Sequence, residues 1–218
     1  MARILFITPN SPSPPTSAAS QRSNLIFRAL RGIGAVDTLL LSYPQRIAPD
    51  QIQHLSEEFH LVGCVGTRIR AEHGAWRLLR PFRPTLVDDL VKYFGSCEPE
   101  YAPQAAAVAE LERCLAQERY DVVIARYLRA ASRTGALGLT PLILDVDDLD
   151  TQVCSSELNA PHQSGWRLGL IKRRWRRLQP VVQRWLSLAD YVWVSNPADR
   201  QELGLQRARW LPNIPFTV

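Results

Sequence analysis

The chain has 218 residues, which is enough for one large domain with a complete hydrophobic core. Hydrophobic residues make up 46% and charged residues 22%, as in ordinary globular proteins, and the net charge is +5. No run of about eighteen apolar residues occurs, so we predict no membrane-spanning helix. The four cysteines form no Cys-x-x-Cys pair and the four histidines do not lie near them at ligand spacing, which argues against a zinc site.

Apolar runs typical of strands alternate with amphipathic segments typical of helices along most of the chain. The predicted strands are residues 3–8, 36–42, 61–65, 121–125, 141–146, 189–195 and 208–213. The predicted helices are residues 18–31, 47–59, 166–188 and 199–203, with two or more proline-interrupted helices between 72 and 119. Asp50 is expected to cap the second helix. Pro180 is expected either to kink the long helix or to open a second one.

The central strands indicate the fold class. Residues 121–125 and 141–146 are continuous apolar runs, as expected for strands buried on both faces of a sheet. Their alternation with helices predicts an α/β fold with a Rossmann-like, doubly wound parallel sheet. Ligands of such sheets bind at the carboxyl ends of the strands, so we expect the functional site there.

Polar residues follow several of these strands and give the candidate substrate contacts. The loop after the first strand contains no glycine, so it is neither a dinucleotide fingerprint nor a P-loop. Either it is a rigid connection, or Ser17 and the first amides of the helix face a ligand, with Arg22 one turn further on. The full set of candidate substrate-binding residues is Ser17, Arg22, Arg126, Asp147, Asp148 and Asn196.

An acidic cluster follows the strand at residues 141–146. Asp145 and Asp147 are spaced so that they either hold a divalent metal bridging a nucleotide diphosphate or orient an acceptor hydroxyl. Alternatively, Asp148 or Asp150 only caps the next helix. These three interpretations stay open at this point.

Two further strand ends have both a functional and a structural interpretation. Either Arg126 and Tyr127 contact a sugar or charged substrate, or Arg126 only pairs with Asp147 or Asp148. Asn196 either contacts substrate or starts a helix. The sequence contains no Ser/His/Asp or Cys/His arrangement, so no catalytic residue is assigned.

The basic charge of the chain is concentrated in one helical segment. No acid occurs between Glu157 and Asp190, an interval that holds seven basic residues. The segment is either a helix packed on the sheet with a solvated basic back or a surface that contacts anionic lipid. No nucleic-acid-binding motif accompanies it. The candidate membrane contacts are Arg173, Arg174, Trp175, Arg176 and Arg177.

The order of several motifs resembles the N-terminal half of retaining glycosyltransferases of the GT-B fold, family 4, of the bacterial exopolysaccharide type. The segments are RILFITP at residues 3–9, SAASQRS at 17–23, YDVVIAR at 120–126, LDVDD at 144–148, ADYVWVS at 189–195 and LPN at 211–213. Three positions depart from the family pattern. Ser17-Ala18-Ala19 replaces glycines, Arg126-Tyr127 stands where many members have a histidine, and Ile214 replaces the glycine after Pro-Asn.

The resemblance implies two facing Rossmann-like domains, with the acceptor mainly on the first and the nucleotide-sugar donor mainly on the second. Residues 1–218 are then expected to be the acceptor-side domain of a hexosyltransferase, inactive alone and lacking the C-terminal donor-binding domain. The family transfers sugar without a metal, so no metal is expected at Asp145 and Asp147, and this domain alone is expected to bind no cofactor.

The resemblance also implies a role in cell-surface polysaccharide or glycolipid synthesis. The expected partners are a sugar or lipid-linked acceptor and an anionic membrane surface, with no nucleic acid. The expected location is the cytoplasm, peripheral to the inner face of the membrane. Two alternatives are a non-enzymatic Rossmann-like module that docks on a membrane or partner, and a single-domain metal-dependent transferase that uses Asp145 and Asp147.

Overall fold

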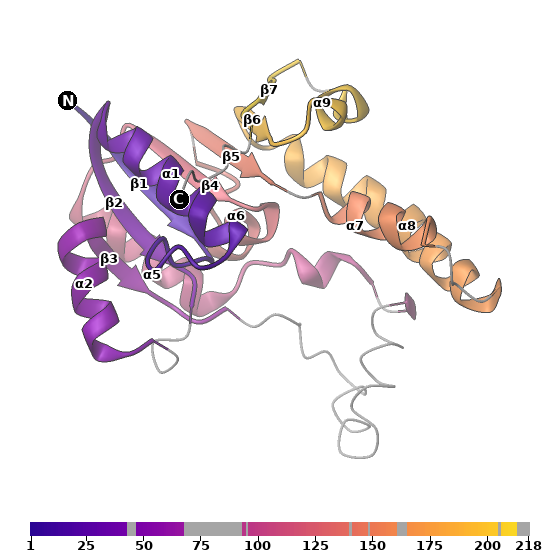
Figure 1. The fold of residues 1–218 in the computed structure, drawn as a ribbon, viewed down its shortest axis with the longest axis horizontal. Coiled ribbons are helices and arrows are strands. Elements are labelled where there is room, and N and C mark those ends of the chain that lie inside the picture. Colours follow the sequence, from indigo (N-terminus) through magenta and orange to yellow (C-terminus); the bar gives the residue numbers. More distant parts are fainter. Residues whose placement is uncertain are drawn as a thin grey trace.

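A seven-stranded sheet, parallel throughout, forms the centre of the fold in the computed structural model of the chain (Figure 1). The structure describes residues 1–42, 47–67, 93–94, 96–139, 141–147, 149–160, 165–204 and 206–212. The strand order is β3-β2-β1-β4-β5-β6-β7. The strands are β1 (Ala2–Thr8), β2 (Gly34–Leu40), β3 (Leu61–Cys64), β4 (Val122–Arg126), β5 (Leu142–Val146), β6 (Tyr191–Val194) and β7 (Ala208–Trp210). The first six strands follow the Rossmann order, which confirms the predicted fold class.

Helices cover both faces of this sheet. The helices are α1 (Ala18–Arg31), α2 (Pro49–Phe59), α5 (Ala105–Gln117), α6 (Leu128–Thr134), α7 (Asp150–Leu158), α8 (Gly165–Leu186) and α9 (Pro197–Leu203). Because successive strand residues point to opposite faces, two separate cores form. Phe6 of β1 packs with Phe27 of α1 on one face. Leu5 of β1 shares the other core with residues of α5, α6 and α8.

All seven predicted strands are present, each with ends within three residues of the expected position. The helix α6 is not expected from the sequence, and α7 is expected only in the alternative in which Asp148 or Asp150 caps the next helix. The N-cap of α7 is Leu149, and Asp150 lies in its first turn. The predicted capping role of Asp50 is wrong: Ala48 is the N-cap of α2, and Asp50 lies in the first turn. The helix α8 continues through Pro180, so no second helix begins there. Most of the predicted helical region before α5 (68–92) lies outside the described residues.

Candidate functional site

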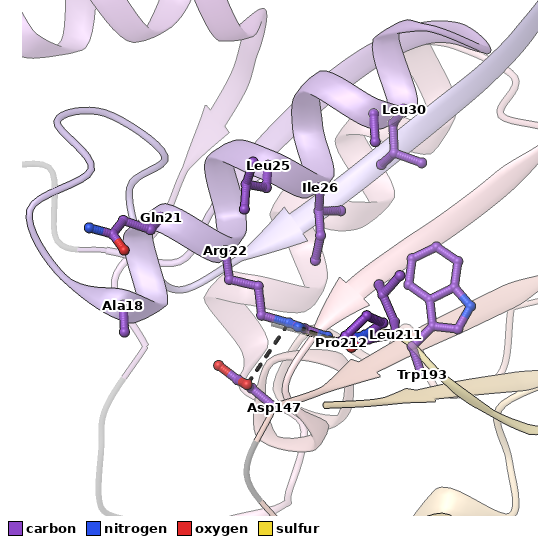
Figure 2. Close-up of a pocket in the computed structure, with 11 residues that line it drawn as sticks. Ala18, Gln21, Arg22, Leu25, Ile26, Leu30, Asp147, Trp193, Leu211 and Pro212 are labelled. Atoms are coloured by element: carbon purple, nitrogen blue, oxygen red, sulfur yellow. Dashed lines mark hydrogen bonds and ion pairs between the residues drawn. The ribbon is translucent and has the colours of Figure 1, made fainter. Parts of the chain in front are cut away.

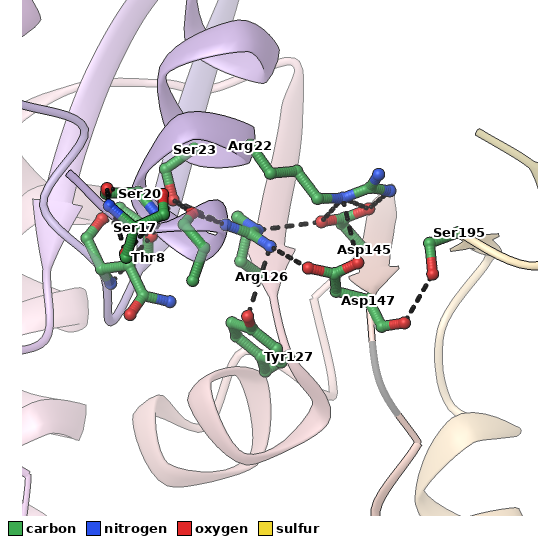
Figure 3. Close-up of polar contacts among 12 residues, drawn as sticks. Thr8, Ser17, Ser20, Arg22, Ser23, Arg126, Tyr127, Asp145, Asp147 and Ser195 are labelled. Carbon is green, nitrogen blue, oxygen red and sulfur yellow. Dashed lines mark hydrogen bonds and ion pairs between the residues drawn. The ribbon is translucent and has the colours of Figure 1, made fainter. Parts of the chain in front are cut away.

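A buried aspartate lies between two arginines where β4 and β5 end (Figure 3). Asp145 and Arg126 are opposite each other in the register of these two strands, so both side chains lie on the α1 face of the sheet. The Asp145 carboxylate accepts a hydrogen bond from Arg126 Nε at 2.9 Å and from Arg22 Nη2 at 2.6 Å. Asp145 and Arg126 are fully buried, and Arg22 of α1 is 5% exposed.

The same two arginines connect Asp145 to three other parts of the fold. Arg126 Nη2 donates to Asp147 Oδ2 at 3.2 Å, and Arg126 Nη1 donates to the Ser23 hydroxyl of α1 at 2.8 Å. Arg22 Nη2 donates to the main-chain carbonyl of Leu211, just after β7, at 3.2 Å. The side chains of Arg22, Arg126, Asp145 and Asp147, called the ion network below, therefore join α1, β4, β5 and the segment after β7.

The ion network holds two positive and two negative side chains. Burial alone would lower the pKa of Arg22, but its hydrogen bond to Asp145 and the charges of Asp145 and Asp147 raise the pKa above the ordinary value of arginine. Both oxygens of Asp145 accept hydrogen bonds from guanidinium groups. A metal ion at Asp145 would have to displace both arginines, and their buried charges would then lose the carboxylate that compensates them. The donor set therefore favours an ion-pair role for Asp145 over metal ligation.

Tyr127 directly follows Arg126 and adopts an unusual backbone conformation. Its φ of 65° lies in the left-handed region, which is rare for a residue with a bulky side chain. Its N–H donates to the Asp145 carbonyl at 2.7 Å, and the Arg126 guanidinium lies over its ring at 4.8 Å from the centroid. Backbone strain of this kind concentrates at functional sites, where surrounding contacts hold it in place.

One pocket lies on the α1 side of the ion network (Figure 2). Its volume is about 350 Å³. Arg22, Gln21 and Asp147 supply its polar groups, whereas most of the wall is apolar. The apolar wall consists of Ala18, Leu25, Ile26, Ala29, Leu30, Trp193, Leu211 and Pro212. A pocket with an apolar wall and a few polar groups is the usual form of a small-molecule site.

The second pocket has a volume of about 260 Å³ and lies beside the starts of α6 and α7. Residues at or just beyond the carboxyl ends of four strands line it: Pro9, Leu41, Tyr127 and Val146, after or at the ends of β1, β2, β4 and β5. Arg129, Arg133 and Asp150 add charged groups. The second pocket thus lies where open α/β sheets bind their ligands.

The structure brings together three of the six candidate substrate contacts, Arg22, Arg126 and Asp147. Ser17 and Asn196 instead cap α1 and α9: their side chains accept hydrogen bonds from the N–H groups of Ser20 and Ala198. Asp148 lies outside the described residues. A substrate-binding role for these six residues stays a prediction.

From the sequence, Asp145 is expected only as a metal ligand or as a group that orients an acceptor hydroxyl, and Trp193 is not expected at the site. Asp145 had a usable signal, because a carboxylate inside an otherwise apolar buried strand needs a cationic partner. The strained φ of Tyr127 and the position of Trp193 on the wall of a pocket do not show in a residue pattern.

The five candidate membrane contacts do not share one surface. Arg173 and Arg176 are exposed. Arg174 Nη2 lies 3.3 Å from Glu100, Trp175 packs against the core, and Arg177 donates to the carbonyl of Phe94 at 3.0 Å. Among the described residues, no helix is long and apolar enough to cross a bilayer.

The chain has a distant likeness to a glycosyltransferase of known structure. A solved structure described as spinosyn rhamnosyltransferase SpnG complexed with thymidine diphosphate is 15% identical to this chain, with a TM-score of 0.39. The alignment covers 98% of this chain and 50% of that chain, so this chain spans half the length of that protein. No family model and no curated protein matches the chain. The fold assignment rests on the strand order and not on this likeness.

Proposed function

We propose that residues 1–218 are the N-terminal, acceptor-binding domain of a nucleotide-sugar-dependent glycosyltransferase with the GT-B fold. The observation that carries this proposal is the pair of pockets that flank a buried ion network at the carboxyl ends of β4 and β5. The order of the sequence motifs, which resembles family 4 enzymes, adds the reaction type. In this proposal the acceptor binds over the strand ends, and a second domain carries the donor.

The start of α1 supports the placement of the nucleotide on another domain. In dinucleotide-binding Rossmann domains, glycines let the loop backbone approach the pyrophosphate, and free N–H groups of the helix bind it. Here, the N–H of Ser17 donates to the Ser20 hydroxyl, and the N–H of Ser20 donates to the Ser17 hydroxyl. These reciprocal bonds form a capping box. Two donors of the usual phosphate site are therefore already engaged.

We further propose that the domain works at the inner face of the membrane, in the synthesis of a cell-surface polysaccharide or glycolipid. The first half of α8 extends beyond the sheet beside α7 (Figure 1). It exposes Trp166 (70%) and Leu168 (40%) next to the exposed bases Lys172, Arg173 and Arg176. Exposed apolar groups beside Lys and Arg are typical of helices that bind anionic bilayers.

The same surface is also compatible with the alternative function, a non-enzymatic module that docks on a membrane. The two hypotheses differ in whether sugar is transferred. The third hypothesis, a metal-dependent transferase, loses support because both oxygens of Asp145 accept hydrogen bonds from arginines.

The test is a transfer assay with the complete gene product, a panel of radiolabelled nucleotide sugars and a bacterial lipid extract as acceptor. We expect one nucleotide sugar to label a lipid-linked product, and we expect residues 1–218 alone to transfer none. Absence of transfer from every donor would favour the non-enzymatic module. Transfer by residues 1–218 alone would refute the proposal that the acceptor and the donor bind to different domains.

A further inference from the structure

We propose that a basic groove on the first half of α8 is a binding site for a multiply charged phosphate group, a phosphate monoester or a diphosphate. The groove has a volume of about 460 Å³ and is lined by one glycine and four bases: Gly169, Lys172, Arg173, Arg176 and Arg177. The proposal concerns a surface other than the acceptor site at the strand ends. It rests on the proposed function only in naming a membrane lipid as one source of the phosphate.

The helix places the five groove residues on one face. Each lies three or four residues from another, and side chains at such spacings are neighbours on a helix. Three pairs of like charge result: Lys172 with Arg176, Arg173 with Arg176, and Arg173 with Arg177. Like charges at these spacings destabilise a helix. An anion in the groove would relieve this repulsion.

Acidic side chains compensate other bases of α8 but not those of the groove. Arg174 Nη2 lies 3.3 Å from Glu100, and Arg184 Nη2 lies 2.6 Å from Glu98. Within the part of the chain that the structure describes, none of the four groove bases forms an ion pair with an acid. The sequence of α8 itself contains no acid. The groove therefore keeps four positive charges around a space that is open to solvent.

Phe94 holds two of the four bases in place. The Nη1 of Arg177 donates a hydrogen bond to the carbonyl of Phe94 at 3.0 Å, and the Arg173 guanidinium lies 5.3 Å from the centroid of the Phe94 ring. A guanidinium group has five N–H donors, so both arginines keep donors for a ligand. Side chains that are positioned before binding lose less conformational entropy when a ligand binds.

Gly169 leaves open space beside these bases. Apart from the helix backbone, no heavy atom lies within 4 Å of the position that a Cβ would take there. Glycine inside a helix is less favourable than alanine, and the packing around position 169 does not require it. The space beside Gly169 is therefore available to a ligand.

The number of charges in the groove favours a phosphate monoester or a diphosphate over a phosphodiester. A phosphate monoester carries a charge of about −1.5 to −2 at pH 7 and offers three acceptor oxygens. Lys and Arg bind such oxygens through short charge-assisted hydrogen bonds. Trp166 lies three residues before Gly169 on the same side of α8 and is 70% exposed, and Trp side chains are enriched at the bilayer interface. A lipid with a phosphate headgroup would therefore bind with its chains beside Trp166.

The test measures binding of diphosphate to the chain by isothermal titration calorimetry at fixed ionic strength. We expect saturable binding, and in the double variant Arg173→Gln, Arg176→Gln the affinity should fall at least about tenfold. The control Arg28→Gln, Arg119→Gln removes the same charge at two other exposed positions, and its affinity should stay within about twofold of wild type. Gly169→Leu keeps all four charges but fills the groove, so it should also weaken binding at least about tenfold. All five positions are exposed, so these variants should fold.

Sedimentation with two kinds of vesicle distinguishes the sources of the phosphate. Phosphatidic acid presents a phosphate monoester, whereas phosphatidylglycerol presents a phosphodiester. At matched surface charge, stronger sedimentation with phosphatidic acid indicates a lipid headgroup, whereas equal sedimentation together with saturable diphosphate binding indicates a soluble phosphate, and both results support the inference.

Absence of saturable diphosphate binding would overturn the inference, as would unchanged affinity in the double variant or in Gly169→Leu. The binding assay contains neither sugar donor nor acceptor. Failed sugar transfer with intact diphosphate binding would therefore count against the proposed function alone, and sugar transfer without diphosphate binding would count against this inference alone.

Discussion

At the scale of single residues, Asp145 is the centre of the ion network. It is fully buried and accepts hydrogen bonds from two buried arginines. Such a network contributes little net stability compared with apolar packing, but removal of one partner leaves a buried charge without compensation. Asp145 therefore fixes the positions of Arg22 and Arg126, the two residues that connect α1 to the strand ends.

Replacement of Asp145 should accordingly destabilise the domain strongly. Asp145→Ala leaves the guanidinium groups of Arg22 and Arg126 buried with only Asp147 as an acid, and we expect a loss of about 3–5 kcal/mol in the free energy of unfolding. Denaturant-induced unfolding followed by circular dichroism measures it. The control Asp50→Ala, at an exposed position in α2, should change stability by less than about 0.5 kcal/mol. Equal effects of both substitutions would contradict the structural role of Asp145.

Tyr101 gives the domain a pH-dependent stability with a definite sign. Burial and Asp150 raise the pKa of Tyr101 above its value of about 10 in the unfolded chain. Above pH 10, the unfolded chain therefore loses a proton that the folded protein keeps, and the free energy of unfolding falls by about 1.4 kcal/mol per pH unit. Burial and the hydrogen bond to Asp37 also raise the pKa of Tyr120, so Tyr120 adds to the same loss of stability at alkaline pH.

The difference between wild type and Tyr101→Phe isolates this contribution. Below about pH 9 the two proteins should differ by a constant amount, and above pH 10 the variant should lose stability less steeply. Urea unfolding at several alkaline pH values checks it. Parallel curves across the whole range would show that the pKa of Tyr101 does not differ between the folded and unfolded states.

At the scale of elements, the two halves of α8 have different surroundings. Its second half buries Leu178, Val182 and Leu186 in the core. Its first half exposes the apolar and basic residues described above. The sequence predicts the basic helix, and the structure shows that Arg174 and Trp175 turn toward the body of the domain.

Neutralising the exposed bases should weaken binding to anionic vesicles. Each Lys or Arg near such a surface contributes about 1 kcal/mol, so the combined Lys172→Gln, Arg173→Gln and Arg176→Gln variant should bind about a hundredfold more weakly. Sedimentation with phosphatidylglycerol vesicles measures it, and Arg28→Gln is the single-charge control. Equal sedimentation of wild type and triple variant would refute membrane docking by α8.

The sequence predicts a helix well where one face is buried over many residues, because apolar residues then recur at helical spacing. It predicts a helix poorly where this pattern is short or weak. Residues 18–31 were predicted as a helix with both ends correct, because its apolar face packs on the sheet over its whole length. The helix α6 has only seven residues, and six of them are buried, so no polar face reveals it. In α7 only Thr151 and Cys154 are buried, and its apolar pattern is correspondingly weak.

The sequence predicts several residues of the candidate site but not how the fold brings them together. Arg22, Arg126 and Asp147 were expected at strand and helix ends, and the structure places them together. Their assembly depends on the strand order, which puts β4 next to β1 and β5 next to β4. A single sequence does not specify that order. The pocket walls formed by Trp193 and Leu25 depend on it in the same way.

At the scale of the whole molecule, the sheet explains why both pockets and the ion network lie in one region. The connection from β3 to β4 returns the chain to the other side of β1, so the strand order reverses between β1 and β4. At such a point, the loops after neighbouring strands diverge and leave a crevice at the carboxyl ends. Arg126 ends β4 and Tyr127 follows it directly, so both lie beside this crevice.

In the proposed function, this crevice binds the acceptor of a sugar transfer. The most direct measurement is kcat/KM for the acceptor in the complete gene product, compared between wild type, Asp147→Asn and the control Asp50→Asn. Asp147→Asn keeps the side-chain shape but removes the charge that pairs with Arg126 at 3.2 Å. We expect its kcat/KM to fall at least about tenfold, which corresponds to about 1.4 kcal/mol, while Asp50→Asn stays within about twofold. Equal kcat/KM values in all three proteins would contradict an acceptor site at the ends of β4 and β5.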